Sequence, residues 1–401
     1  MSLTDESKLK QLISKVPQLT IFFWIIKVLC TTVGETFSDF LSFNVGLGLP
    51  LTTLLMGIAF VIVLFVQFRA SKYIPLVYWL TVVLISVFGT LVTDNLTDGF
   101  GVPLERSTII FSLLLAVTFL LWFISEGTLS IHSIYTAKRE TLYWLSILFT
   151  FALGTAVGDL YSEQLGVGYL NTGIIVVIVI ACVFVAWKLK FNEILAFWIV
   201  YILTRPLGAS LGDYLSQSKK NGGLELGATL TSVIFLLAIV AIIVFLAITK
   251  YDLVAKGGNS ESINTSSNLK LVWTQTIASI IVFLTVGIGG YVWCNHYVVP
   301  EIDSSQTTLS GQLNDFVSIE TNILDHINGA DFSTAKSEAD DLEYQWDQSE
   351  PKLRKIDRKT WTDIDGTIDE VLAAVRTKSP EPNKCDTVIQ NSIQVLNTSN
   401  Q

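Results

Sequence analysis

Nine long apolar runs, separated by short polar segments, fill most of the first 294 residues of this 401-residue chain. A helix needs about 20 mostly apolar residues to cross the hydrocarbon core of a bilayer. Beyond these runs, apolar residues recur at helical spacing, which predicts about four amphipathic helices over residues 306–397. The pattern predicts an all-α integral membrane protein with nine spans, at residues 18–41, 49–68, 74–95, 107–125, 141–161, 170–188, 194–215, 226–249 and 271–293.

The first eight runs repeat a unit of two helices. In each odd-numbered run, a Trp is followed by a Gly ten positions later and by an Asp five positions after that. Each unit crosses the membrane twice, so all units have the same orientation and form parallel repeats around an axis along the membrane normal. The four copies are Trp24–Gly34–Asp39, Trp79–Gly89–Asp94, Trp144–Gly154–Asp159 and Trp198–Gly208–Asp213.

Basic residues mark one side of the predicted membrane region. Most loop lysines and arginines flank the same ends of the runs, whereas the opposite loops hold only Arg106, Lys219 and Lys220. By the positive-inside rule, the N-terminus is cytoplasmic, and nine crossings place the C-terminal part outside the cytoplasm of a multi-pass cell-membrane protein. The expected domains are a cytoplasmic segment 1–16, an eight-helix core 17–250 with repeats at about 17–70, 72–128, 138–190 and 192–250, a cytoplasmic linker 251–270, a ninth transmembrane helix 271–293 and an extracytoplasmic helical domain 300–401.

The composition indicates two different solvents for one chain. Hydrophobic residues make up 51% and charged residues 15% of the chain, with a mean hydropathy of +0.54. Residues 301–386 hold 19 acidic and 9 basic side chains, a net charge of −10, whereas residues 1–300 hold 16 acidic and 17 basic ones. The acidity therefore belongs to the C-terminal domain. Without a basic cluster, nucleic acid is excluded as a partner.

No motif in the sequence indicates an enzyme. His132, His296 and His326 lie outside the predicted spans, and the chain has no HExxH, nucleophile elbow or phosphate-binding glycine loop. No cofactor is expected other than a bound divalent cation. Cys294 and Cys385 both fall on the extracytoplasmic side, where a disulfide is allowed. Their spacing alone does not decide whether one forms.

Ionisable groups inside membrane spans are costly, so they mark candidate functional sites. Lys27, Glu35 and Asp39 belong to one polar stripe of the first span, where successive members are four residues apart. Lys27 either points into the interior or snorkels to the cytoplasmic surface. Arg205 lies on the Asp213 face of the seventh span and needs a partner there. The repeat register favours Glu35 as that partner, with Asp213 as the alternative.

Carboxylates outnumber cations among these interior residues. Such an excess of oxygen ligands suits a hard cation or protons rather than a soft metal, which prefers His or Cys. The residues expected to ligate a metal are Asp39, Asp94, Asp159 and Asp213. The expected transport or ion site adds Glu35 and Arg205 to them.

Each candidate also has a structural explanation. The repeat Trp residues are expected to anchor their helices at the membrane interface, and the repeat Gly residues to allow close helix packing. The Asp residues either face the interior or lie at water level and cap the following turn. Glu35 and Arg205 either serve the site or form a structural ion pair.

Two short motifs carry a family resemblance: Gly34-Glu35-Thr36 followed by Asp39-Phe40, and the Gly-Asp-Tyr-Leu sequence of 212–215. Over about residues 15–250 the chain resembles a family of bacterial membrane-anchored proteins built from four tandem repeats, each with two transmembrane helices and a Trp. The resemblance implies the eight-helix architecture. That family has no assigned activity, so the resemblance implies no function.

We expect a membrane transporter or channel for a small cation, either a divalent metal or a proton-coupled solute. The alternative is a membrane sensor or scaffold whose extracytoplasmic domain binds a protein partner, and an enzyme acting on lipid comes third. Asp residues that converge inside the membrane favour transport, whereas Asp residues in solvated loops favour the alternative. The expected partners are the lipid bilayer and a small cation.

Overall fold

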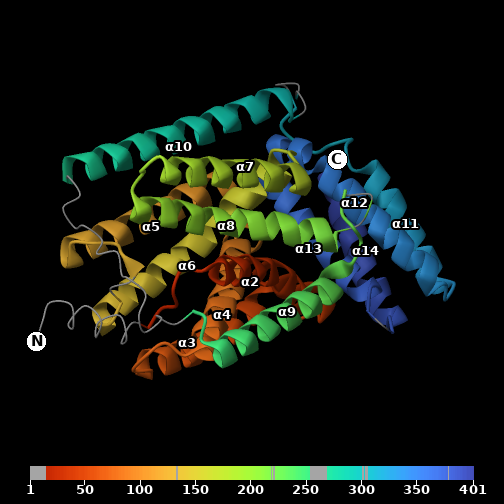
Figure 1. Cartoon of the computed structure of the whole chain (residues 1–401). Coiled ribbons are helices and arrows are strands. Elements are labelled where there is room, and N and C mark those ends of the chain that lie inside the picture. Colours follow the sequence, from red (N-terminus) through yellow and green to blue (C-terminus); the bar gives the residue numbers. More distant parts are fainter. Residues whose placement is uncertain are drawn as a thin grey trace, which may run out of the picture.

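The computed structural model describes residues 15–131, 134–217, 219, 222–252, 269–299, 302, 306–377 and 379–401. In these ranges the chain is all-helical, with thirteen α-helices, three π-helices and no strand (Figure 1). Nine of the described helical segments are long and apolar enough to cross a membrane. Most of the expected cytoplasmic segment 1–16 and linker 251–270 falls outside the described residues.

Each predicted span coincides with a helix. The first helix of the first three repeats ends at the repeat Asp and continues as one π-helical turn, a rare conformation that often marks functional positions. The helix pairs of the four repeats are α2 (Ile21–Asp39) with α3 (Leu49–Arg69), α4 (Pro75–Asp94) with α5 (Leu104–Glu126), α6 (Ala137–Asp159) with α7 (Tyr169–Lys188), and α8 (Glu193–Ser216) with α9 (Gly227–Thr249). The π-helices are η1 (Phe40–Asn44), η2 (Asn95–Gly99) and η4 (Leu160–Gln164).

The first helices of the four repeats form a closed inner ring. Helix α2 packs against α4, α4 against α6, α6 against α8, and α8 returns to α2 (Figure 1). The second helices lie outside this ring. Each packs against the first helix of the next repeat: α3 on α4, α5 on α6, α7 on α8, and α9 on α2. Between 56% and 67% of each inner span is buried, against 11% to 28% of each outer span.

The four repeat glycines stand where the inner helices approach most closely. A Cβ added to any of them would come closer than 3.0 Å to a side-chain atom of the following repeat. The residue it would meet always lies seven positions after that repeat's Trp. The pairs are Gly34 with Ser86, Gly89 with Phe151, Gly154 with Arg205 and Gly208 with Thr31. This agrees with the expectation of close packing, and the last pair closes the ring.

The expectation that the repeat Trp residues anchor the helices at the membrane interface is wrong for three of the four. Trp79, Trp144 and Trp198 are 1–3% exposed and belong to the main hydrophobic core, while Trp24 is partly buried against it. The reason is that these residues lie on the inner ring and turn toward its neighbours. Each is preceded by another aromatic residue, and the paired rings pack edge to face: Phe23, Tyr78, Tyr143 and Phe197.

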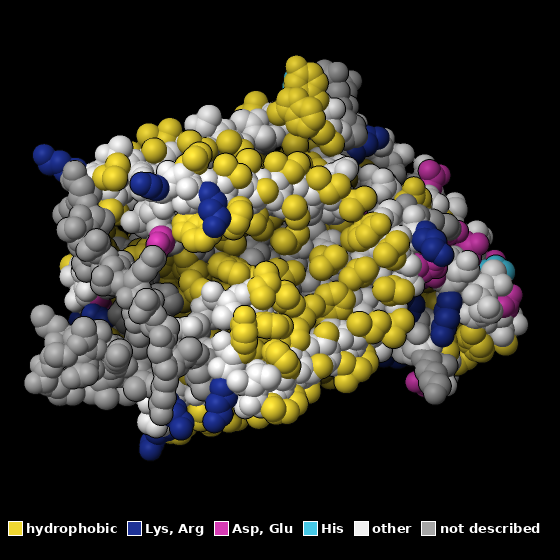
Figure 2. Space-filling view, viewed as in Figure 1, with side chains coloured by type: hydrophobic (Ala, Val, Ile, Leu, Met, Phe, Trp, Pro, Cys, Tyr) yellow, Lys and Arg dark blue, Asp and Glu magenta, His cyan; other side chains and the backbone are white. Residues whose placement is uncertain are grey.

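The ninth apolar helix, α10 (Leu269–Tyr297), lies at the edge of the ring, and only 6% of its span is buried. A separate bundle follows with its own hydrophobic core. Figure 2 shows hydrophobic side chains spread over the long helices and acidic side chains gathered at the bundle end. The bundle helices are α11 (Asn314–Asn328), α12 (Phe332–Ile356), α13 (Arg358–Val375) and α14 (Pro382–Ser399).

No disulfide links the bundle to the ninth helix. Cys294 of α10 is buried in a cluster with Leu104 of α5 and Leu160 of η4. Cys385 is buried in the bundle core, where its thiol contacts the Ala374 carbonyl oxygen at 3.6 Å. Because each thiol lies in a different hydrophobic cluster, the bridge that the sequence left open is absent.

Candidate functional site

The identical spacing of the four repeats stacks equivalent residues into layers along the ring. Seven positions after each Trp lie Thr31, Ser86, Phe151 and Arg205, which the glycine contacts place around one level. One helical turn further lie Glu35, Thr90, Thr155 and Ala209, and the repeat Asp residues follow after another turn. Duplication has therefore supplied the layers, while substitutions within them have made the four walls chemically different.

Arg205 is the centre of this arrangement. Its side chain is 1% exposed, and its Nη2 donates to Glu35 Oε2 and to Thr90 Oγ1, each at 2.5 Å. Its Nη1 donates to the Thr31 carbonyl oxygen at 3.3 Å. Together with Gly154, which packs against its stem, Arg205 touches all four repeats. The structure thus contains the Arg205–Glu35 contact that the register favours, and Asp213 is not its hydrogen-bond partner.

Three carboxylates gather on the next turns. Ligand oxygens of Glu35, Asp39 and Asp213 all lie within 4.8 Å of one another, the one such group found among the described residues. Glu35 is 9% and Asp213 8% exposed. Asp94 and Asp159 are half-buried on the opposite side of the ring and do not belong to this group, although both interact electrostatically with Glu35.

The alternative role of the Asp residues as helix caps does not fit the structure. The side chains of Asp39, Asp94 and Asp159 make no capping hydrogen bond to the π-helices that follow them. Asp213 lies within α8, which continues to Ser216. The four carboxylates are therefore not held by their own helix ends.

Lys27 lies in the interior and does not snorkel. It is 1% exposed, and its Nζ stands 3.6 Å from the centroid of the Phe151 ring and 4.2 Å from that of Tyr201. Among the described residues, no group accepts a hydrogen bond from it. Lys27 lies two helical turns before Glu35 on α2, on the side of Arg205 away from the carboxylate group.

Sequence reasoning missed a set of buried tyrosines beyond Lys27. The hydroxyls of Tyr78 and Tyr143 lie 2.5 Å apart, and the Tyr73 hydroxyl donates to Asp252 Oδ2 at 2.6 Å. Tyr201 has a buried hydroxyl without a hydrogen-bond partner among the described residues. The aromatic residue before each repeat Trp is a signal in the sequence that would have found two of these tyrosines.

The bundle packs over the end of the ring where the carboxylates lie. Helix α12 contacts η4, and α13 contacts η1 and η2. Arg358 Nη2 donates to the Val102 carbonyl oxygen at 2.9 Å, and its Nη1 lies 3.7 Å from Glu105 Oε2. Arg354 Nη2 lies 4.0 Å from Asp98 Oδ1. Two arginines of the bundle thus meet two acids of the second repeat.

Acidic residues of the bundle line the same junction. Burial and the nearby Asp98 together raise the pKa of Asp365 to about 7, although a hydrogen bond from Trp346 lowers it. Burial also raises the pKa of Asp347, helped by Glu343 and Glu350. The junction is therefore crowded with negative charge, which favours bound protons or cations there.

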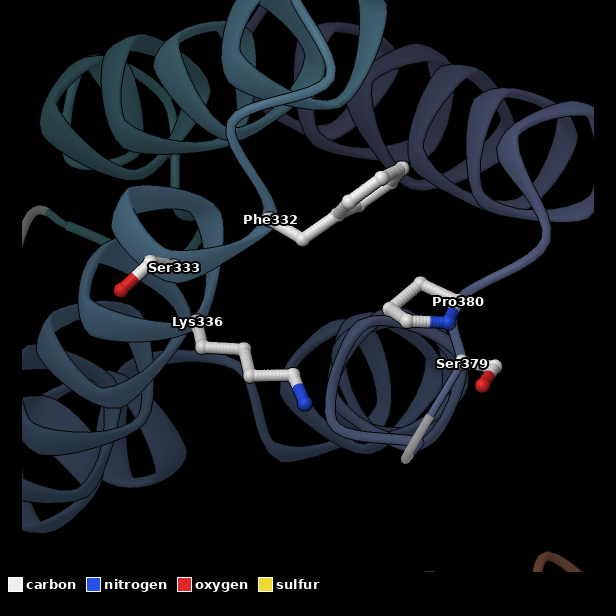
Figure 3. Close-up of a pocket in the computed structure, with 5 residues that line it drawn as sticks. All are labelled: Phe332, Ser333, Lys336, Ser379 and Pro380. Atoms are coloured by element: carbon white, nitrogen blue, oxygen red, sulfur yellow. The ribbon is translucent and has the colours of Figure 1, made fainter.

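A hollow lies on the surface of the bundle. Figure 3 shows Phe332 and Lys336 of α12 extending toward Pro380 in the connection between α13 and α14, with Ser333 and Ser379 at the two sides of the hollow. The one charged group, Lys336 Nζ, already donates to the Thr377 carbonyl oxygen at 2.8 Å. This hollow therefore offers little chemistry for a ligand.

The fold and the layered interior are those of an all-helical protein made of tandem two-helix repeats, with ionisable groups along the ring they form and, among the described residues, nine helices long and apolar enough to cross a membrane. A family model described as Repeat of Unknown Function (DUF347) matches residues 22–73, 77–128, 142–190 and 196–251. These matches cover just over half of the chain, and the protein belongs to this repeat family. No curated protein and no solved structure matches the chain.

Proposed function

We propose that the protein is a multi-pass transporter or channel for a small cation, either a divalent metal or a proton-coupled solute. In this proposal the N-terminus is cytoplasmic, the eight repeat helices form the membrane core, and the bundle lies outside the cytoplasm above the ring. The distribution of lysine and arginine between the loops supports that orientation.

The observation that carries the proposal is the carboxylate group of Glu35, Asp39 and Asp213. Their oxygens approach within 4.8 Å of one another, a spacing that one hard cation spans. Two of the three are at least nine-tenths buried, so their mutual repulsion is weakly screened by water. A bound cation relieves that repulsion, and protons do so in its absence.

The charge balance of the ring points the same way. Arg205 pairs with Glu35 and interacts electrostatically with Asp94 and Asp159, and it is the one cation that does so among the described inner residues. Lys27 lies on the other side of Arg205 and contacts none of them. Carboxylates therefore exceed their counter-charges at the bundle end. In this proposal a cation that approaches from the bundle end meets the carboxylates first and is repelled by the Arg205 guanidinium beyond them.

In this proposal the bundle covers the end of the ring at which the carboxylates lie. It contacts the π-helices that follow Asp39, Asp94 and Asp159, and it adds acidic side chains to the approach. A field of one sign concentrates ions of the opposite sign. The alternative, a sensor or scaffold in which the bundle binds a protein partner, keeps the same contacts but assigns no ion to the ring.

The test is cation binding and flux by the full chain. Binding of Mg²⁺, Ca²⁺ and Mn²⁺ is measured calorimetrically in detergent, and flux is measured in liposomes with an enclosed indicator. Asp39→Asn and Asp213→Asn keep the shape of each side chain but remove its charge. We expect each to weaken binding about tenfold or more, equivalent to at least about 1.4 kcal/mol.

Glu225→Gln is the matched control, because the Glu225 side chain is 60% exposed and its described ion-pair partner is the exposed surface residue Lys219. We expect it to bind and transport as the parent does. Asp94→Asn and Asp159→Asn should have intermediate effects, since they influence Glu35 through the field alone. If the parent protein neither binds nor moves any of these cations, the proposal is wrong and the sensor alternative replaces it.

A further inference from the structure

Lys27 is a buried cationic side chain for which the cation site has no use. Two aromatic rings cover its Nζ, at 3.6 Å and 4.2 Å from their centroids, and no acceptor reaches it among the described residues. Cation–π contact compensates only part of the cost of removing an ammonium from water. An amine without its proton has no such cost. The site therefore suits a group that changes its protonation state.

The titratable groups around Lys27 are few and can be named helix by helix. Its own helix α2 contributes Cys30, and α8 contributes Tyr201 and Arg205. Helices α4 and α6 contribute Tyr78 and Tyr143 next to Tyr201, while α9 has no titratable residue over Gly227–Thr249. Among the residues that the structure describes, no carboxylate lies beside Lys27, so none of them holds its proton in an ion pair.

The tyrosines lead from Lys27 toward the end of the ring opposite the bundle. The phenols of Tyr201, Tyr143 and Tyr78 interact electrostatically with one another, and the last two share a hydrogen bond of 2.5 Å. The ring of Tyr78 meets that of Tyr73 edge-on, with centroids 5.6 Å apart. Tyr73 in turn donates to Asp252 at 2.6 Å. Burial raises the pKa of Asp252, so this carboxylate takes up a proton more readily than one in water.

We propose that Lys27 is a proton-binding site of the ring, which exchanges its proton with the Asp252 end through Tyr201, Tyr143, Tyr78 and Tyr73. Release converts the ammonium to an amine. Two links of this route are hydrogen bonds in the structure, Tyr143 with Tyr78 and Tyr73 with Asp252, and the proposal requires side-chain rotation to close the others. Each phenol oxygen then takes one proton and passes its own hydroxyl proton to the next, and the Asp252 carboxylate receives the last. No phenolate remains, and one proton leaves Lys27 for each one that reaches Asp252.

The link from this proton to transport rests on the proposed cation site. Arg205 lies between the two, bonded to Glu35 on one side and interacting with Lys27 on the other. A divalent cation at Glu35 frees Arg205 from its partner and adds positive charge, which drives the proton off Lys27. The expected result is exchange of a cation for a proton.

The direct test does not depend on any transported cation. Acid–base titration of the full chain in detergent, between pH 5 and pH 9, is compared for the parent and Lys27→Met. We expect Lys27→Met to lack one exchangeable proton per chain. Lys27→Arg, which keeps a charge but does not release its proton, should lack it too. Lys72→Met is the matched control at an exposed lysine, and its curve should superimpose on the parent's in this range.

Kinetics test the route. After a rapid pH jump, Tyr201→Phe should slow proton exchange at Lys27 at least tenfold, because it removes the first hydroxyl and little else. Tyr297→Phe, at a tyrosine that is 70% exposed, should leave the rate unchanged. Identical titration curves for the parent and Lys27→Met would overturn the proton site. An unchanged exchange rate in Tyr201→Phe would overturn the tyrosine route.

Liposomes then separate this inference from the proposed function. With a pH indicator inside, the parent should move protons against a cation gradient, while Lys27→Met should move the cation without them. Cation flux with undiminished proton movement in Lys27→Met would refute the coupling and leave the cation site intact. A protein that moves no cation but loses its titrating proton in Lys27→Met would refute the proposed function alone.

Discussion

Removing Arg205 should destabilise the protein more than removing Arg205 together with the charge of its partner. In Arg205→Ala, Glu35 keeps its charge beside Asp39 and Asp213 but loses the guanidinium that contacts it at 2.5 Å. Breaking one side of a buried ion pair typically costs about 3–5 kcal/mol. We expect a loss at the upper end of that range, since the stranded carboxylate has two acidic neighbours. The substitution also removes the hydrogen bond from Arg205 to Thr90 and the packing of the Arg205 side chain against Gly154.

The double variant Glu35→Gln/Arg205→Leu removes both charges and keeps most of the side-chain volume. Uncharged replacements of buried ion pairs are often neutral or stabilising. We expect it to be at least about 2 kcal/mol more stable than Arg205→Ala. The free energy of unfolding is measured by titrating dodecyl sulfate into mixed micelles and following the tryptophan fluorescence of the inner ring.

Lys219→Ala is the control for this comparison. Its pair with Glu225 has a distance of 3.4 Å, but the side chains are 75% and 60% exposed, so its loss should have no measurable effect. If Arg205→Ala is as stable as the parent, the buried pairing is refuted. If the double variant is as unstable as Arg205→Ala, the loss comes from packing and not from the stranded charge.

Three further outcomes are expected. Gly208→Ala should lower the free energy of unfolding by about 1–3 kcal/mol, because the added Cβ overlaps Thr31. Gly287→Ala in α10 meets open space and should be neutral or stabilising, which dodecyl sulfate titration of both variants would show. Trp79→Ala should cost about 3–5 kcal/mol and Trp293→Ala, at a 57% exposed residue, should cost far less in the same assay; equal effects would restore the interface-anchor interpretation. Burial raises the pKa of Glu320 from 4.5 to about 8, so the folded bundle holds this proton more tightly than the unfolded chain does, and its stability should fall as pH rises from about 4.5 to about 8. Glu320→Gln should flatten that decline, measured as the urea dependence of Cys385 labelling at each pH; parallel curves would contradict it.

Much of the helical architecture could be predicted because the length of each apolar run indicates the length of its helix and the Trp–Gly–Asp spacing fixes the register. The same register led to the contact between Arg205 and Glu35, since identical spacing places them one turn apart on equivalent helices. Lateral order could not be obtained in this way. Nothing in the spacing states that α9 packs on α2, which is a property of the closed ring.

The errors share one physical origin, which is the direction that a side chain takes within a layer. Tryptophan usually prefers the membrane interface, so the sequence predicts an anchoring role for Trp79. Its helix lies in the inner ring, however, and Trp79 is buried there. Asp94 and Asp159 share the depth of Asp39 and Asp213, yet the latter two alone approach each other and Glu35. Depth follows from counting residues along a helix, whereas convergence depends on how four different walls rotate and pack.

The contact between α9 and α2 has a consequence for the order in which the repeats can be joined along the chain. At this contact Phe22 packs on Phe245 and Tyr251, and the Gln18 amide donates to the Asp252 carbonyl oxygen at 3.1 Å. Residues 18 and 252 are thus neighbours in space, although they bound opposite ends of the repeat array. A circular permutant that joins these two positions and opens the chain between the first and second repeats would retain every helix–helix seam. During synthesis, however, α9 is made with the last repeat. The packing around α2 in the first repeat is therefore the last to be completed.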